Sequence, residues 1–210
     1  VSNIRREYAR CSLRRQDLDP DPYRQFERWF SEAMASGMPD PNAMSLATAT
    51  AAGAPSLRTV LLKAYDPRGF VFYTNYESRK AREIAENANV ALLFLWIPLE
   101  RQVAITGAAE RVSAAESLKY FLSRPRGSQL GAWVSHQSQV ISNRQLLLAK
   151  LDEMKRKFAA GEIPLPPAWG GYRVVPKTIE FWQGGEDRLH DRFLYSLQSD
   201  ATWSIDRLAP

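Results

Sequence analysis

The spacing of apolar residues along the chain changes from a helical period to a strand period near residue 43. Before that point apolar residues recur at helical spacing, at Phe26, Trp29, Phe30 and Met34, and Gly37 ends the run. We interpret this segment as a helix whose apolar side packs in the core.

Short apolar runs separated by turn residues make up most of the remaining chain. They predict strands over 44–50, 56–63, 70–74, 90–96, 101–112, 171–175, 178–183, 191–195 and 202–205. Glycine and proline mark tight turns at 51–55 and 66–69. Because such turns join antiparallel strands and are too short for parallel crossovers, we expect an antiparallel barrel.

Three helical segments interrupt these strands, over 78–88, 113–134 and 143–160. Pro125 is expected to break the second, and Gly161 ends the third. The pattern therefore predicts a mainly β, α+β fold, in which helices surround an antiparallel barrel. The chain shows no internal repeat or linker, so we expect one domain over 1–210, with the arginine-rich segment 1–20 as an N-terminal arm.

The charge balance leaves three interpretations open. The 210 residues carry a net charge of +5, which fits nucleic-acid binding, a basic surface without a partner, or arginines that hold small anions. The longest apolar run, 90–96, is far shorter than the roughly 18 residues that a membrane span needs, so no membrane partner is expected.

Few residues could bind a metal or act as a thiol nucleophile. Cys11 is the only cysteine, and His136 and His190 are the only histidines. A single cysteine excludes an internal disulfide and fits a reducing, cytoplasmic compartment. We expect no metal site, and any redox chemistry must come from an organic cofactor.

Two segments offer anion sites without a glycine-rich phosphate loop. Arg58 and Lys63 lie in one predicted strand at a spacing of five, so a regular strand points them to opposite faces. Either they pair with carboxylates or they serve two different anions. Ser78, Arg79 and Lys80 begin a predicted helix, where an N-cap serine, free N–H groups and two cations favour a phosphate over a solvated turn.

Two further groups are candidates for ligand binding. Tyr120, Arg124 and Ser128 recur at intervals of four, a spacing that also fits an ordinary surface pair. If the chain is extended from Arg188, then Arg188, His190 and Arg192 share one face. Three such groups repel each other unless an anion or nearby carboxylates, such as Glu186, Asp187 or Asp191, compensate them.

The segment around these residues resembles a known family. FWQGGEDRLHDRFLY and the ending WSIDRLAP are similar to the pyridoxamine/pyridoxine 5′-phosphate oxidases, as are RREY at 5–8, RTVLLK at 58–63, FYTN at 72–75, SRKA at 78–81, ERQV at 100–103, SRPRGSQLGAWVS at 123–135 and WGGYRV at 169–174. The resemblance covers nearly the whole chain.

The resemblance implies an FMN-binding split β-barrel that works as a homodimer with sites at the interface. It implies oxidation of pyridoxamine 5′-phosphate and pyridoxine 5′-phosphate to pyridoxal 5′-phosphate, in vitamin B6 cofactor synthesis and salvage. The substrate passes an electron pair to the flavin, oxygen becomes hydrogen peroxide, and the amine substrate releases ammonia. It implies no nucleic-acid partner.

The resemblance also implies residue roles, carried over by matching motif. FMN contacts are expected from Arg58, Thr59, Val60, Leu61, Leu62, Lys63, Tyr73, Thr74, Arg79, Lys80, Gln102, Gln137, Ser138, Trp182 and Arg192, with Gln137 and Ser138 reaching the second subunit's flavin. Substrate contacts are expected from Arg5, Arg6, Glu7, Tyr8, Lys63, Tyr120, Arg124, Ser128, Arg188, Leu189 and His190. Arg188 and His190 are the expected catalytic residues, and Asp40 is an expected neighbour of the site.

Three other functions stay open on the sequence. One is another FMN split-barrel protein, such as a flavin reductase or a haem-handling relative, which need not keep Tyr120, Arg124, Arg188 and His190 together. A second is a nucleic-acid-binding module that uses the N-terminal arginines. The third is a carrier that binds pyridoxal phosphate without catalysis.

Overall fold

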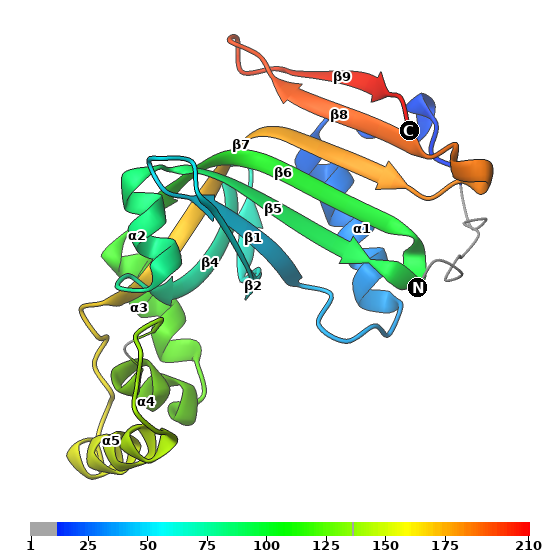
Figure 1. The fold of residues 1–210 in the computed structure, drawn as a ribbon. Coiled ribbons are helices and arrows are strands. Elements are labelled where there is room, and N and C mark those ends of the chain that lie inside the picture. Colours follow the sequence, from blue (N-terminus) through cyan, green and yellow to red (C-terminus); the bar gives the residue numbers. More distant parts are fainter. Residues whose placement is uncertain (1–11, 136) are drawn as a thin grey trace.

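The computed structural model describes residues 12–135 and 137–210, and within them one curled antiparallel sheet carries the fold (Figure 1). Its nine strands are β1 (Ala43–Ala49), β2 (Pro55–Leu61), β3 (Ala64–Asp66), β4 (Gly69–Asn75), β5 (Asn89–Trp96), β6 (Arg101–Arg111), β7 (Trp169–Gln183), β8 (Asp191–Leu197) and β9 (Trp203–Leu208). The order is β2-β1-β5-β6-β7-β4-β3, and β8 joins β7 and β9. The predicted α+β class and the antiparallel pairing are confirmed.

Five α-helices surround this sheet: α1 (Pro22–Ala35), α2 (Arg79–Glu86), α3 (Ala114–Ser123), α4 (Arg126–Val134) and α5 (Arg144–Lys157). Helix α1 lies behind the sheet in Figure 1, whereas α3, α4 and α5 form a lobe at one end. No helix in the described ranges is long and apolar enough to cross a membrane.

Aromatic side chains of α1 fill the hollow of the sheet. Phe26 is fully buried, with its ring centre 4.9 Å from that of Phe70 and 5.2 Å from that of Phe94. Trp29 meets Phe181 edge to face at 5.2 Å. As predicted, the apolar residues at helical spacing lie on the side of α1 that packs against the core.

Strand β7 corrects the prediction of two separate strands over 171–175 and 178–183. The chain stays extended through Pro176, and β6 pairs with β7 from Tyr172 to Gln183, with a register shift between Thr106 and Gly107. On its other edge β7 pairs first with β4 and then with β8. Proline is tolerated here because its missing N–H falls between the two partners.

The helical region over 113–134 divides where proline was expected to break it. Arg124 takes an extended conformation at the end of α3, and Pro125 precedes α4. Phe121, Leu130 and Trp169 then belong to a second, smaller core under α5. The break turns Arg124 away from the helix surface and toward Trp169, whose ring centre lies 4.7 Å from the guanidinium carbon.

Candidate functional site

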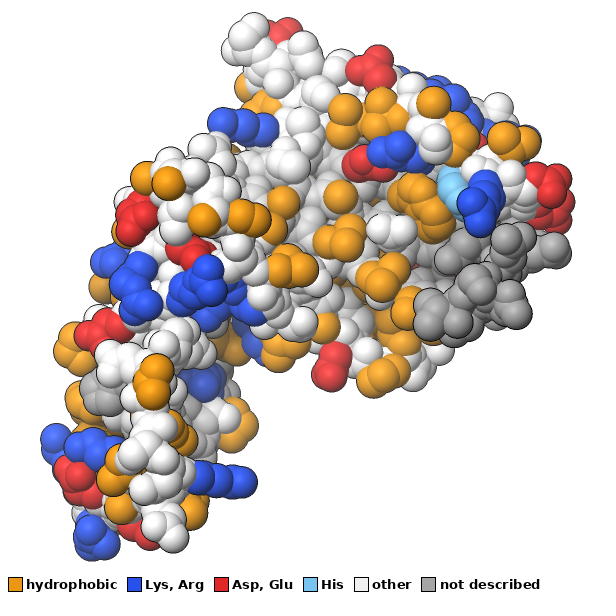
Figure 2. Space-filling model, in the orientation of Figure 1, with side chains coloured by type: hydrophobic (Ala, Val, Ile, Leu, Met, Phe, Trp, Pro, Cys, Tyr) orange, Lys and Arg blue, Asp and Glu red, His pale blue; other side chains and the backbone are white. Residues whose placement is uncertain are grey.

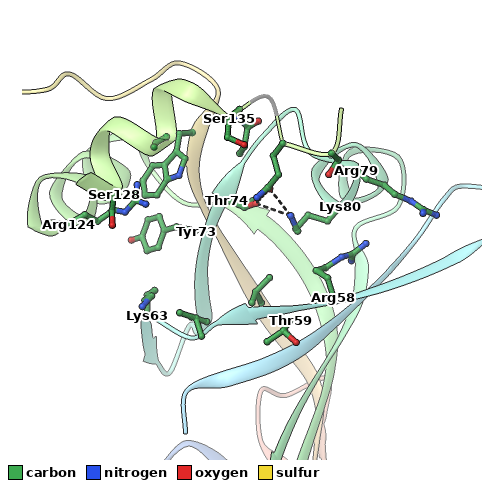
Figure 3. Close-up of a pocket in the computed structure, with 18 of the residues that line it drawn as sticks. Arg58, Thr59, Lys63, Tyr73, Thr74, Arg79, Lys80, Arg124, Ser128 and Ser135 are labelled. Atoms are coloured by element: carbon green, nitrogen blue, oxygen red, sulfur yellow. Dashed lines mark hydrogen bonds between the residues drawn. The ribbon is translucent and has the colours of Figure 1, made fainter. Parts of the chain in front are cut away.

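A cavity of about 920 Å³ lies between the edge of the sheet and the lobe formed by α3 and α4. It is lined by residues of β2, β4, α2, α3, α4 and the segment after α4, and these include Arg58, Thr59, Val60, Leu61, Lys63, Tyr73, Thr74, Arg79, Lys80, Tyr120, Arg124, Ser128, Gln137 and Ser138. Figure 3 shows Lys63, Arg124 and Ser128 at one end and Arg58, Arg79 and Lys80 at the other. The structure thus brings together most of the residues expected from the sequence.

The start of α2 forms one end of this cavity. Ser78 caps the helix by accepting a hydrogen bond from the Ala81 N–H, as its position predicted. Lys80 is buried, and its Nζ donates to Thr74 Oγ1 at 3.2 Å and to Gln137 Oε1 at 2.9 Å. Burial and the nearby Arg58 lower the pKa of Lys80 to about 8.

At the same end of the cavity, Arg58 is held by the buried carboxylate of Glu83, which the sequence did not point to. Its Nη2 lies 3.3 Å from Glu83 Oε2, and Arg79 Nε donates to Glu83 Oε1 at 2.8 Å. Burial would raise the pKa of Glu83, but hydrogen bonds from Ser56, Thr48 and Arg79 outweigh it and hold the pKa at about 2. Glu83 therefore stays ionised and ties the two arginines together.

The other end of the cavity is aromatic and cationic. Tyr73 stacks on Tyr120 with ring centres 4.0 Å apart, and Trp169 continues the stack at 5.4 Å from Tyr73. Arg124 lies over Trp169, and its Nη1 is buried without a hydrogen-bond partner among the residues that the structure describes. A buried donor of this kind is costly unless a ligand satisfies it, so this end is suited to an anion.

Lys63 and Arg58 line one cavity, which corrects the expectation of opposite strand faces. Strand β2 ends at Leu61, so Lys63 lies beyond the regular alternation. The two cations nevertheless lie at different ends of the cavity, as Figure 3 shows. Leu62, an expected FMN contact, is buried in the main core and is not among the residues that line the cavity.

Gln102, Trp182 and Arg192 lie apart from this cavity, although the same ligand was expected to join them to Arg58. They line a second cavity of about 310 Å³ on β6, β7 and β8. Arg192 is held there by Glu180, with Nε 2.8 Å from Oε1 and Nη2 3.2 Å from Oε2. Within one chain the expected FMN residues are therefore divided between two surfaces.

His190 lies beside this second surface. The extended conformation expected from Arg188 onward is wrong. Residues Glu186–Arg188 form a 3-10 turn, Arg188 has a φ of 63°, and β8 begins only at Asp191. The His190 ring packs against Trp182 with ring centres 4.6 Å apart and a tilt of 43°, and its Nδ1 accepts a hydrogen bond from the Gly185 N–H at 3.1 Å. The turn over Glu186–Arg188, and not alternation along a strand, therefore places His190 against Trp182.

Five further expected residues are not assigned to either surface. Arg5, Arg6, Glu7 and Tyr8 lie outside the described residues. Asp40 has a φ of 46° in the turn before β1, and it is not among the residues that line the large cavity. The described residues contain no cluster of three or more histidine, cysteine or acidic side chains suited to a metal ion.

Three residues that shape the site were missed by the sequence analysis: Glu83, Trp169 and Glu180. The spacing of Arg79 and Glu83 is that of an i,i+4 helix pair, so Glu83 could have been found from the sequence. Trp169 contacts Arg124, which is far away in the chain, and Glu180 contacts Arg192 on the neighbouring strand. Neither pair has a sequence spacing that predicts the contact.

Comparison with known proteins agrees with this arrangement. A family model described as pyridoxamine 5′-phosphate oxidase matches residues 30–158. The chain belongs to the pyridoxamine 5′-phosphate oxidase family. A second model, described as the pyridoxine 5′-phosphate oxidase C-terminal dimerisation region, matches residues 169–210. That match contains β7, β8 and β9, and so Glu180, Trp182 and Arg192 of the second cavity, while Gln102 on β6 belongs to the first match.

Individual members of the family are similar over the full chain. Pyridoxine/pyridoxamine 5′-phosphate oxidase of Rippkaea orientalis is 63% identical over 100% of this chain and 99% of its own, and that of Aliarcobacter butzleri is 59% identical over the same shares. Among solved structures, PhzG of Burkholderia lata is 32% identical with a TM-score of 0.88 and covers 93% of this chain and 95% of its own. An FMN-binding protein of Nostoc punctiforme, 15% identical with a TM-score of 0.74 over 92% of this chain and 100% of its own, shares the split-barrel fold.

Proposed function

We propose that this protein is an FMN-dependent oxidase that converts pyridoxamine 5′-phosphate and pyridoxine 5′-phosphate into pyridoxal 5′-phosphate, with oxygen as acceptor and hydrogen peroxide as product. The observation that carries the proposal is the pair of cationic ends in one cavity. Flavin mononucleotide and the substrate each bring one phosphate, and a cavity with two separate anion sites accommodates both. The family membership supports the same activity.

The residues at the start of α2 fit the phosphate of FMN. Arg58, Arg79 and Lys80 supply three cations, and the first N–H groups of a helix have no partners within it. Lys80 is held by neutral oxygen atoms, which leaves its charge available to an anion. The flavin ring, when bound, supplies the two-electron oxidation that no protein side chain can perform.

The aromatic end fits the substrate phosphate. Arg124 presents an unsatisfied buried donor, and Lys63 and Ser128 lie beside it in the cavity. Charge-assisted hydrogen bonds to a phosphate would satisfy these groups and hold the pyridine ring in one place. These residues bind and orient the substrate, which is the main way an enzyme assists a cofactor reaction.

The ring of the substrate would be held by Arg188 and His190. His190 Nδ1 accepts a hydrogen bond from the Gly185 N–H, which fixes the orientation of the ring beside Trp182. We therefore assign His190 a positioning role, and Arg188 a role in binding the ring and stabilising developing negative charge.

The two surfaces would form one site in a homodimer. The residues expected to surround one flavin are divided between the large cavity and the surface around Trp182 in each chain. A symmetric dimer places a surface of one chain against a different surface of the other, and creates two composite sites at once. The match of residues 169–210 to a dimerisation region supports this arrangement.

Oxygen consumption by the FMN-loaded protein tests the activity. We expect pyridoxamine 5′-phosphate to drive oxygen uptake and to give pyridoxal 5′-phosphate and hydrogen peroxide in equal amounts. A protein that binds pyridoxal 5′-phosphate without oxygen uptake would be a carrier, and one that stays colourless after incubation with FMN would contradict the flavin site. Reduction of free flavin by a nicotinamide without oxidation of the substrate would indicate a flavin reductase.

A further inference from the structure

Arg124 is held in the large cavity by aromatic faces. Its guanidinium carbon lies 4.7 Å from the ring centre of Trp169 and 5.9 Å from that of Phe121. Burial lowers the pKa of Arg124, and within residues 12–135 and 137–210 Nη1 has no hydrogen-bond partner. Among the described residues no carboxylate forms an ion pair with it.

Other arginines around the two cavities are held differently. Arg58 lies against Glu83, and Arg192 forms two hydrogen bonds to Glu180. A carboxylate fixes an arginine well, but it also cancels the charge that an incoming anion needs. A ring face attracts the guanidinium through its quadrupole and leaves the full positive charge in place.

Trp169 is itself fixed from several elements. It begins β7 opposite Asn75 of β4, and its backbone N–H donates to Pro166 O at 3.0 Å. Its ring is nearly parallel to Tyr73 at 11° and to Tyr120 at 10°. The side chain is only 8% exposed, so the ring is a rigid support on which Arg124 rests.

We propose that Trp169 is a positioning residue that sets specificity for phosphorylated substrates, because its ring aims Arg124 at the substrate phosphate without neutralising it. The inference rests on the proposed function and deepens it. Trp169 need not touch the substrate phosphate. Its effect passes through Arg124, and so it depends on the phosphate group of the ligand and on the presence of the arginine.

Steady-state kinetics of Trp169→Leu test the role, with Trp169→Phe as the matched variant that keeps a weaker ring. We expect KM for pyridoxamine 5′-phosphate to rise by roughly 5–30-fold in Trp169→Leu and by less in Trp169→Phe, with the effect mainly on KM and not on kcat. The inhibition constant of inorganic phosphate should rise by a similar factor. Pyridoxine, which has no phosphate, should inhibit as it does in the wild type.

A double-mutant cycle with Arg124→Ala separates positioning from general support of the fold. In the Arg124→Ala background, Trp169→Leu should raise KM by less than about twofold, because the group through which it acts is gone. If Trp169→Leu loses FMN or fails to fold, Trp169→Phe carries the same cycle. Flavin absorbance and the melting temperature check that each variant is folded and loaded.

Two results would overturn the inference. One is an equal loss in both backgrounds, and the other is an equal weakening of pyridoxine and phosphate as inhibitors. Either would make Trp169 a structural residue or a stacking partner of the pyridine ring. A wild-type enzyme that does not oxidise pyridoxamine 5′-phosphate would instead refute the proposed function. An active wild type with an unchanged KM in Trp169→Leu would refute only the role of Trp169.

Discussion

Lys80 is a buried cation whose hydrogen-bond acceptors are neutral oxygen atoms, and this makes its charge sensitive to pH near neutrality. Burial and Arg58 lower its pKa to about 8, so the free protein loses this charge as the pH rises through that value. A phosphate monoester stays doubly charged over the same range. We therefore expect FMN affinity to fall above about pH 8, by at most about tenfold per pH unit.

Titration of flavin fluorescence with the apoprotein across this range measures the effect. Lys80→Arg is the matched control, because its guanidinium stays charged well above this range. Its affinity for FMN should be nearly independent of pH. Equal pH dependence in both proteins would mean that a group other than Lys80 controls the binding.

Glu83 makes an acid-dependent contribution to stability. Its folded pKa of about 2 lies below the ordinary value of 4.5, so its contribution is complete above pH 4.5 and is lost as the pH falls through about 2. The shift corresponds to at most about 3 kcal/mol, of which about 2 kcal/mol is lost by about pH 3. Urea unfolding of the apoprotein near neutral pH and near pH 3 measures this loss.

Glu83→Gln keeps the size of the side chain and removes the titration. It should be less stable than the wild type near neutral pH, and the difference should shrink by about 2 kcal/mol near pH 3. A gap between the two proteins that stays constant with pH would show that the carboxylate charge contributes nothing to stability.

Sequence alone identified the cations of the cavity but not what holds them. The N-cap role of Ser78 followed from a local rule, because it depends on residues close in the chain. The expectation that Arg58 and Lys63 point to opposite faces was wrong, because β2 ends at Leu61 and both residues line one cavity. The turn at Arg188 could not be predicted from alternation, since its φ of 63° is one that arginine rarely adopts. The support of Arg124 by Trp169 joins residues 45 positions apart in the chain.

At the scale of elements, the length of β7 was hidden by Pro176. Proline normally limits a strand, so the pattern predicted two short strands. In the fold, β4 takes the first part of one edge and β8 the last part, and the proline lies between them. The pairing of strands along an edge depends on tertiary structure. The hydrophobic pattern therefore predicted both extended segments of β7 but not that they form one continuous strand.

The backbone of β7 also passes close to the aromatic wall of the cavity. A Cβ added at Gly171 would lie 2.8 Å from Tyr73 Cε1 and 2.7 Å from Val112 Cγ2. We expect Gly171→Ala to displace the Tyr73 ring, to destabilise the fold by about 1–3 kcal/mol and to raise KM. Gly127→Ala in α4, where a Cβ meets nothing within 4 Å, is the control.

Thermal unfolding and substrate kinetics of both variants check this prediction. Gly127→Ala should be neutral or slightly stabilising, because alanine is the better helix residue. If Gly171→Ala kept the wild-type melting temperature and KM, the close approach of β7 to Tyr73 would have no role in shaping the cavity.

At the scale of the whole molecule, the protein has an apolar face as well as two separate surfaces that carry the expected site residues. Leu95 is 54% exposed and Ile97 57% exposed at the end of β5. Figure 2 shows apolar side chains over the open front of the sheet, and basic ones between the sheet and the helical lobe. Exposed apolar surface of this kind is typical of a subunit interface. Spacing and composition point to residues on both surfaces, whereas the expectation that two chains share a site came only from the family resemblance.

A complementation experiment decides whether each site is shared between subunits. The Lys63→Ala/Arg124→Ala variant damages only the large cavity, and Arg192→Ala damages only the other surface. Each homodimer then has two damaged sites. In a hybrid of the two chains, one site carries both defects and the other carries none, so the hybrid should have about half the wild-type activity. Co-expression with two different affinity tags, followed by sequential purification, isolates this hybrid. If each site lay within one chain, every site of the hybrid would keep one defect, and the hybrid would be as inactive as its parents.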